Sequence, residues 1–178
     1  MSTVPRYLPH YTVTDYEQWE GDWELWQGIP VAMTPSPFGR HQRCSLRLAR
    51  SLLTAIEAED CKAEVLQEID WIISDDTVVR PDVVVLCGDA PERHVTESPA
   101  LVAEILSPST ADKDRNDKLR LYEDNGVDYY LIVDPNQKAL TSYLRNEQGK
   151  FCLIEPADAL VLTSCVDGEI AVDVASIF

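Results

Sequence analysis

Apolar residues recur at two different spacings along the chain, and each spacing predicts a different kind of element. In residues 40–58 the apolar positions return every three or four residues, which predicts a long amphipathic helix. Its core-facing positions are expected to be Leu46, Ala49, Leu53 and Ile56. Residues 111–125 predict a second helix that stops at Gly126. A shorter helix is expected from Thr14, where Glu17 would complete a capping box.

Strict alternation and short apolar runs dominate elsewhere, and both predict β-strands. The stretch WELWQGIPVAM alternates around Gly28, as a hairpin does. Residues 63–88 predict two strands joined by the turn SDDT, with an irregular point at Pro81, which cannot donate a ladder hydrogen bond. The run ALVAEILS predicts a strand buried on both faces, DYYLIVDP predicts another, and further strands are expected after Pro135.

The mixture of strands and helices predicts one α/β or α+β domain over residues 1–178, with helices packed on a sheet. No apolar run approaches the roughly 20 residues of a membrane helix, and the N-terminus lacks a basic start followed by an apolar block. We therefore expect a soluble cytoplasmic protein with no membrane partner. Five widely spaced cysteines without a CxxC pair favour reduced thiols over a zinc site or a disulfide framework.

The charge of the chain argues against a polyanionic partner, but the distribution of the bases weakens that argument. With 31 acidic and 15 basic residues, the formal net charge is -16, which favours solubility and repels polyanions at long range. Eight of the bases fall in two short windows, namely Arg40, Arg43, Arg47, Arg50, Lys113, Arg115, Lys118 and Arg120. The first four share one helical face and are candidates for contact with nucleic acid, with an ordinary solvated face as the alternative.

Four acidic residues lie where a strand pattern favours apolar side chains, or beside such a place. They are Glu24, Asp82, Glu104 and Asp134. A buried ionised carboxylate needs hydrogen bonds, a cation or a metal, because without them burial is costly or shifts its pKa. If the strands of Asp82 and Glu104 are neighbours, the two carboxylates form an oxygen-only site that suits Mg²⁺ or Mn²⁺.

Each of these acids also has a purely structural interpretation. Asp82 could instead bond a turn or Arg80, and Glu104 could belong to a core salt bridge. Glu24 alone is more typical of an exposed hairpin residue, and Asp134 is more typical of a turn cap.

Lys118 offers the positive charge that phosphate chemistry requires. Asp114 precedes it by four residues, so an ordinary helical ion pair would explain this lysine equally well. The sequence contains no GxSxG elbow, P-loop or GxGxxG motif that would favour another chemistry.

An ordered set of short motifs resembles the PD-(D/E)XK restriction-endonuclease-like superfamily, and more closely the Uma-type endonucleases of bacteria. The set comprises PD at 81–82, EIL at 104–106 and the pattern SPST, D, K, Y, GV, YYLIVDP that follows. The likeness begins at YEQWEGDWELWQGIPVAMTPSPFGRHQ and extends through residue 145. It implies a central mixed sheet flanked by helices, an N-terminal hairpin, and Mg²⁺-dependent hydrolysis of phosphodiester bonds.

The resemblance also implies roles for particular residues. Asp82 and Glu104 match the family's metal-binding acids, and Glu24 matches an upstream acid of the same site. His41 matches a histidine near the start of the first long helix, without an assigned role, and Asp134 is a further supporting residue.

The superfamily places a lysine two residues after the position of Glu104, but this chain has Leu106 there. An apolar side chain cannot supply a charge. In the Uma-type branch a lysine on the following helix substitutes, and here it would be Lys118.

The leading hypothesis is therefore a metal-dependent endonuclease acting on DNA, with Asp82, Glu104 and Lys118 as catalytic residues. Leu106 and the net charge of -16 favour an alternative, a nuclease-fold protein that only binds nucleic acid or a protein partner. The acidic surface also suits a hydrolase of small phosphate esters. Cleavage of both DNA strands would require a second site, so a homodimer is expected.

Overall fold

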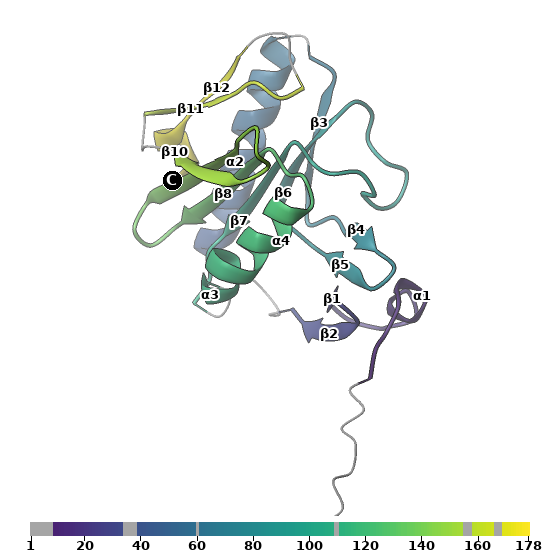
Figure 1. The fold of residues 1–178 in the computed structure, drawn as a ribbon. Helices are drawn as coiled ribbons and strands as arrows, with labels where there is room; N and C mark the ends of the chain where they lie inside the picture. Colours follow the sequence, from purple (N-terminus) through teal and green to yellow (C-terminus); the bar gives the residue numbers. More distant parts are fainter. Residues whose placement is uncertain (1–8, 34–38, 60, 109–110, 155–157, 166–168) are drawn as a thin grey trace, which may run out of the picture.

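A six-stranded sheet forms the centre of the computed structural model, which describes residues 9–33, 39–59, 61–108, 111–154, 158–165 and 169–178 (Figure 1). In spatial order its strands are β10 (Phe151–Ile154), β9 (Ala139–Arg145), β8 (Tyr129–Asp134), β7 (Leu101–Ile105), β6 (Val83–Cys87) and β3 (Ala63–Gln67). Strands β7 and β8 run parallel, and the other neighbours run antiparallel. The predicted mixed sheet is confirmed.

Helices cover both faces of this sheet (Figure 1). Helix α2 (Gly39–Ala58) packs on one face, and α3 (Ala111–Lys113), a π-helical turn (Asp114–Lys118) and α4 (Leu119–Asp124) follow one another on the other. Side chains alternate along a strand, so Ala103 of β7 belongs to the apolar cluster under α2, whereas Val102 belongs to the cluster that includes Tyr122 of α4. Glu104 has the same parity as Val102, and its carboxylate therefore lies on the α4 side.

Helix α2 was predicted correctly, but part of its apolar face was not. Its buried residues are His41, Cys44, Ser45, Leu48, Ala49, Leu52 and Ile56. Leu46 is 63% exposed and Leu53 is 41% exposed. These two leucines recur at intervals of three and four with the exposed Arg43 and Arg50, so they lie on the outward face of the helix.

A second, smaller sheet is formed by strands from two parts of the chain. Its spatial order is β2 (Ile29–Ala32), β1 (Trp23–Trp26), β5 (Thr77–Val79) and β4 (Trp71–Ser74). The hairpin β1–β2 is confirmed, and Gly28 at its turn has a φ of 79°. Helix α1 (Val13–Tyr16) begins after Thr12, two residues before the predicted cap at Thr14.

The hairpin turn predicted in residues 63–88 and the irregular point at Pro81 are confirmed, but each of the two predicted strands divides between the two sheets. Strand β3 belongs to the large sheet and β4 to the small one, and β5 and β6 divide in the same way. The second division falls at Pro81, which has no N–H with which to continue a ladder. This division places the small sheet beside the large one.

The C-terminal residues form a hairpin of β11 (Ala159–Leu162) and β12 (Ile170–Asp173), followed by the 3₁₀ helix η2 (Val174–Ile177). Both β12 and η2 pack against α2. A disulfide joins Cys87 to Cys165, so the expectation of five reduced thiols was wrong for this pair. The two cysteines are 78 positions apart in sequence, yet their Cα atoms lie 5.0 Å apart. Among the described residues, no helix is long and apolar enough to cross a membrane.

Candidate active site

Asp82 and Glu104 are brought together by the pairing of β6 with β7. Val83 pairs with Ala103 in the antiparallel register, and continuing that register by one residue sets Asp82 opposite Glu104. The Oδ2 atom of Asp82 accepts the backbone N–H of Ile105 at 2.7 Å, the residue next to Glu104. The two strands are therefore neighbours, as predicted. Asp82 accepts its hydrogen bond from the strand of Glu104 rather than from Arg80.

His41 lies behind the same carboxylate. Its Nε2 atom is 3.2 Å from Asp82 Oδ2, and within the described part of the chain its buried Nδ1 atom has no hydrogen-bond partner. Burial lowers the pKa of His41, but the hydrogen bond and charge of Asp82 outweigh burial and raise the pKa overall. The structure thus gives this histidine a definite partner, which the sequence did not.

Lys118 projects from the π-helical turn into the interior between two glutamates. Its Nζ atom lies 2.7 Å from Glu104 Oε1 and 3.2 Å from Glu24 Oε1, and the residue is only 5% exposed. Burial opposes its charge, but Glu104, Glu24 and Asp114 together raise its pKa. Its main partners are therefore the two glutamates, rather than Asp114 in a surface ion pair. Leu106, at the position of the superfamily's lysine, is buried in an apolar cluster.

Glu104 is held by two donors through one oxygen. Tyr122 donates its hydroxyl to Oε1 at 2.6 Å, and Lys118 donates to the same atom. Burial raises the pKa of Glu104 to about 8, the charges of Asp114 and Asp82 add to this rise, and Lys118 opposes it. The excess of negative charge around Glu104 thus favours retention of a proton.

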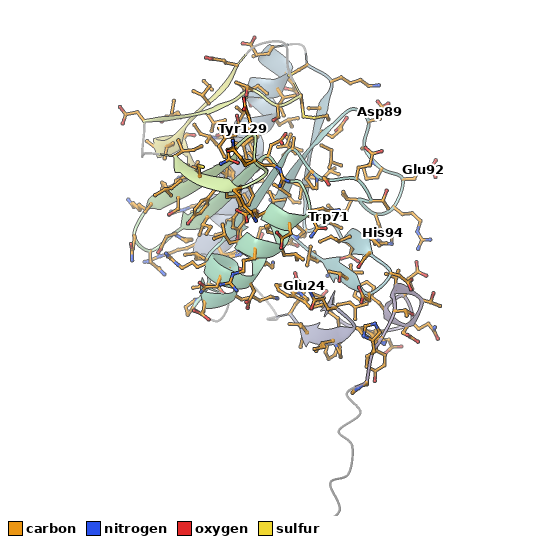
Figure 2. The ribbon with its side chains drawn as sticks, viewed as in Figure 1. Glu24, Trp71, Asp89, Glu92, His94 and Tyr129 are labelled. Atoms are coloured by element: carbon orange, nitrogen blue, oxygen red, sulfur yellow. A yellow bond between two sulfur atoms is a disulfide. The ribbon has the colours of Figure 1, made fainter. Side chains whose placement is uncertain are left out.

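Glu24, labelled in Figure 2, lies on the small sheet where it contacts α3 and the π-helical turn. Its Oε1 accepts the backbone N–H of Arg80 at 3.0 Å, and its Oε2 accepts Trp26 Nε1 at 3.1 Å and the ammonium of Lys113. Burial alone would raise its pKa, but Lys118, Lys113 and the Arg80 N–H lower it to about 2. The structure therefore places Glu24 in contact with two lysines. Within the described residues, no contact joins Glu24 to Asp82.

Asp134 and the arginines of α2 make contacts of a more ordinary kind. Asp134 Oδ1 accepts the backbone N–H groups of Asn136 at 2.9 Å and Gln137 at 3.0 Å, as a turn cap does. Arg47 donates to the carbonyl oxygen of Phe178, and Arg40 donates to Asn136 Oδ1 at 3.4 Å. The remaining two arginines, Arg43 and Arg50, are exposed.

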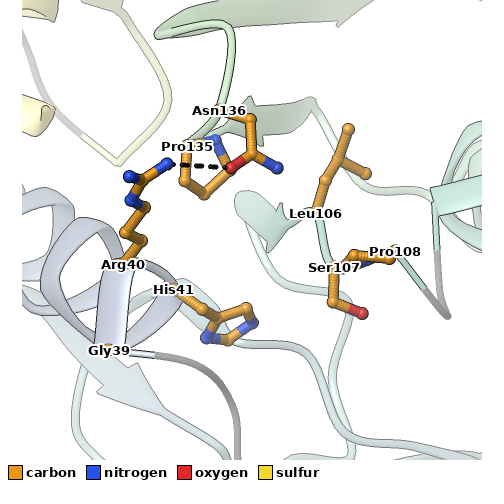
Figure 3. Close-up of a pocket in the computed structure, with 8 residues that line it drawn as sticks. All are labelled: Gly39, Arg40, His41, Leu106, Ser107, Pro108, Pro135 and Asn136. Atoms are coloured by element: carbon orange, nitrogen blue, oxygen red, sulfur yellow. Dashed lines mark hydrogen bonds between the residues drawn. The ribbon is translucent and has the colours of Figure 1, made fainter.

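A cavity of about 610 Å³ opens beside this cluster, between the start of α2 and the segments that follow β7 and β8. Figure 3 shows Arg40 bonded to Asn136 on one side of the cavity, with His41 and Ser107 on the side away from this bond. Since His41 contacts Asp82, the wall of the cavity is also the cover of the carboxylates. The cavity therefore lies next to the site, with His41 between them, and neither Asp82 nor Glu104 is among its described lining residues.

Several residues of the site were missed by the sequence interpretation. They are Trp26, Lys113, Asp114 and Tyr122. Trp26 is distant in sequence and reaches the site from the small sheet, whereas Lys113, Asp114 and Tyr122 lie within five positions of Lys118. The sequence offered one indication of these residues, the highly charged segment DKDRNDK, in which two lysines stand five positions apart.

The side chains fit a divalent cation by charge and by ligand type. The site contains four carboxyl groups (Glu24, Asp82, Glu104 and Asp114) and two ammonium groups (Lys113 and Lys118), so full ionisation with a neutral His41 leaves two excess negative charges. The raised pKa of Glu104 reflects this excess together with burial, and a bound cation would favour loss of its proton. No three His, Cys, Asp or Glu side chains of the described residues form a ready metal cage. Mg²⁺ commonly takes only one or two carboxylates and fills its octahedron with water, so a pair such as Asp82 and Glu104 matches the number of protein ligands that it requires.

The fold has a counterpart among solved structures. It matches the crystal structure of a protein from Anabaena variabilis described as "a putative nuclease belonging to DUF820", with a TM-score of 0.73. The match covers 94% of this chain and 97% of that chain, and the two sequences are 16% identical. A model of the Uma2 family, described as "Putative restriction endonuclease", matches residues 13–175, and the chain belongs to this family. An uncharacterized protein of Synechocystis sp. is 31% identical over 177 residues, covering 94% of this chain and 92% of that protein.

Proposed function

We propose that this protein is a metal-dependent endonuclease that hydrolyses phosphodiester bonds in DNA, with Asp82, Glu104 and Lys118 at its centre. The observation that carries the proposal is the 2.7 Å contact between Lys118 Nζ and Glu104 Oε1. The superfamily's lysine would follow Glu104 on the same strand, where this chain has Leu106. Lys118 brings an ammonium to the same carboxylate from the following helix.

Asp82 and Glu104 would hold Mg²⁺ or Mn²⁺. When bound, the metal would neutralise charge on the scissile phosphate and lower the pKa of a bound water. Ile105 N–H and His41 fix the Asp82 carboxylate, while Tyr122 and Lys118 fix Glu104. Both acids are therefore preorganised before substrate arrives.

Lys118 contributes charge and does not act as a base. Its raised pKa keeps the ammonium protonated at neutral pH. A buried positive charge beside the metal ligands can stabilise the negative charge that develops on the transferred phosphoryl group.

The exposed arginines of α2 are the proposed contacts with the DNA backbone. Arg40 stands at the mouth of the cavity, and Arg43 and Arg50 continue along the outward face of the helix. Contacts of this kind release counterions, so the affinity for DNA should fall steeply with salt concentration. Cleavage of both strands would require two copies of the site, which a homodimer would supply.

A cleavage assay tests the proposal. Supercoiled and linear DNA are incubated with the protein in Mg²⁺, Mn²⁺ or EDTA, alongside Glu104→Gln, Lys118→Met and the surface control Lys150→Met. We expect metal-dependent cleavage that falls by roughly a hundredfold or more in the first two variants and is unchanged in the control.

Three other outcomes would contradict this proposal in different ways. Cleavage that is unchanged in Glu104→Gln would remove Glu104 from the mechanism. Metal-insensitive DNA binding without cleavage would support the alternative of a nuclease-fold binding protein. Hydrolysis of bis-p-nitrophenyl phosphate without any action on DNA would support a small phosphate ester as substrate.

A further inference from the structure

The π-helical turn Asp114–Lys118 changes which side chains share a face of the helix. In an α-helix, residues five positions apart point about 140° away from each other, because each residue turns the helix by about 100°. A π-helical turn accommodates an extra residue and brings such positions together, and turns of this kind are frequent at functional sites. Here the two residues brought together are Lys113 and Lys118.

Both lysines contact the same carboxylate. Lys113 Nζ binds Glu24 Oε2, and Lys118 Nζ lies 3.2 Å from Glu24 Oε1. Trp26 strengthens this arrangement, because its Nε1 donates to Glu24 Oε2 at 3.1 Å and its ring lies 4.5 Å from Lys113 Nζ. Glu24 thus ties together two ammonium groups that come from consecutive turns of one helix.

The two lysines differ in their access to solvent. The side chain of Lys118 is 6% exposed and reaches inward to Glu104, whereas that of Lys113 is 26% exposed. An ammonium carries three N–H donors, so a bond to Glu24 is compatible with donation to a phosphate oxygen arriving from outside. Lys113 is therefore the member of the pair that a DNA strand would meet first.

We propose that Lys113 contacts a backbone phosphate next to the one that is cleaved, and that Glu24 is a positioning residue that keeps Lys113 and Lys118 in register. This assignment replaces the role of metal ligand that the family resemblance implies for Glu24. It rests on the proposed nuclease function. The ligand class is a phosphodiester backbone rather than a base, because an ammonium on a flexible stem recognises charge without reading base edges.

The test compares binding and turnover in Lys113→Met, Lys113→Arg and the control Lys150→Met. Cleavage kinetics are measured in Mg²⁺, and DNA affinity is measured by fluorescence anisotropy over a salt series in the Glu104→Gln background. We expect Lys113→Met to raise KM by roughly tenfold with kcat within about threefold, and to reduce the slope of log Kd against log salt by about one. Lys113→Arg should restore most of the affinity, and Lys150→Met should match the wild type.

Glu24→Gln tests the positioning role separately. We expect kcat to fall by at least about tenfold, with a much smaller change in Kd, because Lys118 loses its second partner while Lys113 stays near the surface. Circular dichroism of each variant establishes that it is folded.

Two results would overturn the inference, and they can be told apart. If wild-type protein cleaves DNA but Lys113→Met keeps the wild-type KM and salt slope, Lys113 is only a structural counter-ion of Glu24. If wild-type protein neither cleaves nor binds DNA, the proposed function fails and this inference fails with it.

Discussion

Glu24 on β1 and Glu104 on β7 are buried to nearly the same degree and share one lysine, yet their acidities differ widely. Their exposed fractions are 1% and 3%, and Lys118 contacts both. The pKa of Glu24 is lowered to about 2, whereas that of Glu104 is raised to about 8. Burial disfavours the charge of both, so the difference comes from their neighbours.

The neighbours of Glu24 are cationic donors, and those of Glu104 include further acids. Lys113 and the Arg80 N–H complete the surroundings of Glu24, while Asp82 and Asp114 raise the pKa of Glu104. The negative charge of Glu24 is therefore compensated by its protein neighbours. The region around Glu104 would gain from an added cation, and this difference supports the separate roles that we propose for the two glutamates.

The largest expected effect comes from removing the lysine that the two regions share. Lys118→Met should destabilise the protein by about 3–5 kcal/mol, because it leaves two buried carboxylates with less compensation. The free energy of unfolding in urea, measured at pH 7 in EDTA, checks this value. A loss below about 1 kcal/mol would show that Lys118 is not the common partner of the two glutamates.

The next effect concerns Glu104 and alkaline pH. Its pKa in the folded protein is about 8, above the ordinary 4.5, so the proton on Glu104 contributes stability below about pH 4.5 that is lost as pH rises through 8. In EDTA the wild type should lose a few kcal/mol over this range relative to Glu104→Gln. Parallel stability curves for the two proteins between pH 5 and pH 8 would contradict the raised pKa.

The smallest effect concerns Glu24 and has the opposite sign. Its folded pKa of about 2 lies below 4.5, so its ionised form contributes stability above about pH 4.5 that is lost as pH falls through 2. Glu24→Gln should therefore cost about 3 kcal/mol at pH 7, and this cost should shrink in acid. Urea titrations at pH 7, 4 and 3 measure the trend, and a constant cost would place the lost stability in packing rather than charge.

The sequence predicted the Glu104 side of this comparison far better than the Glu24 side. A charged residue inside the apolar run ALVAEILS is conspicuous, and Asp82 directly precedes the apolar run VVVL of the neighbouring strand. The resemblance to the Uma-type branch, rather than the pattern itself, pointed to a lysine on the next helix in place of Leu106. Local sequence patterns, together with this resemblance, were enough to predict these contacts, since β6, β7 and α4 follow one another closely in the chain.

The contacts of Glu24 could not be predicted in this way, because they join distant segments of the chain and involve the π-helical turn. Lys113 and Lys118 reach one carboxylate only because the turn gains a residue, and helical periodicity predicted no such change. The division of residues 63–88 between two sheets was hidden for a related reason, because β5 pairs with the distant β1, where Val78 lies opposite Leu25. The exposed Leu46 and Leu53 show that apolar spacing alone does not determine which face of a helix is buried.

The bond between Cys87 and Cys165 has a consequence for the covalent integrity of the molecule. A peptide cut in the turn between β9 and β10, at the exposed Gln148, would separate the chain into one piece with Cys87 and another with Cys165. The shorter piece carries the C-terminal hairpin that packs on α2. While the bond is oxidised, a nicked molecule would keep this hairpin covalently attached to the end of β6, and after reduction only its non-covalent packing would hold it.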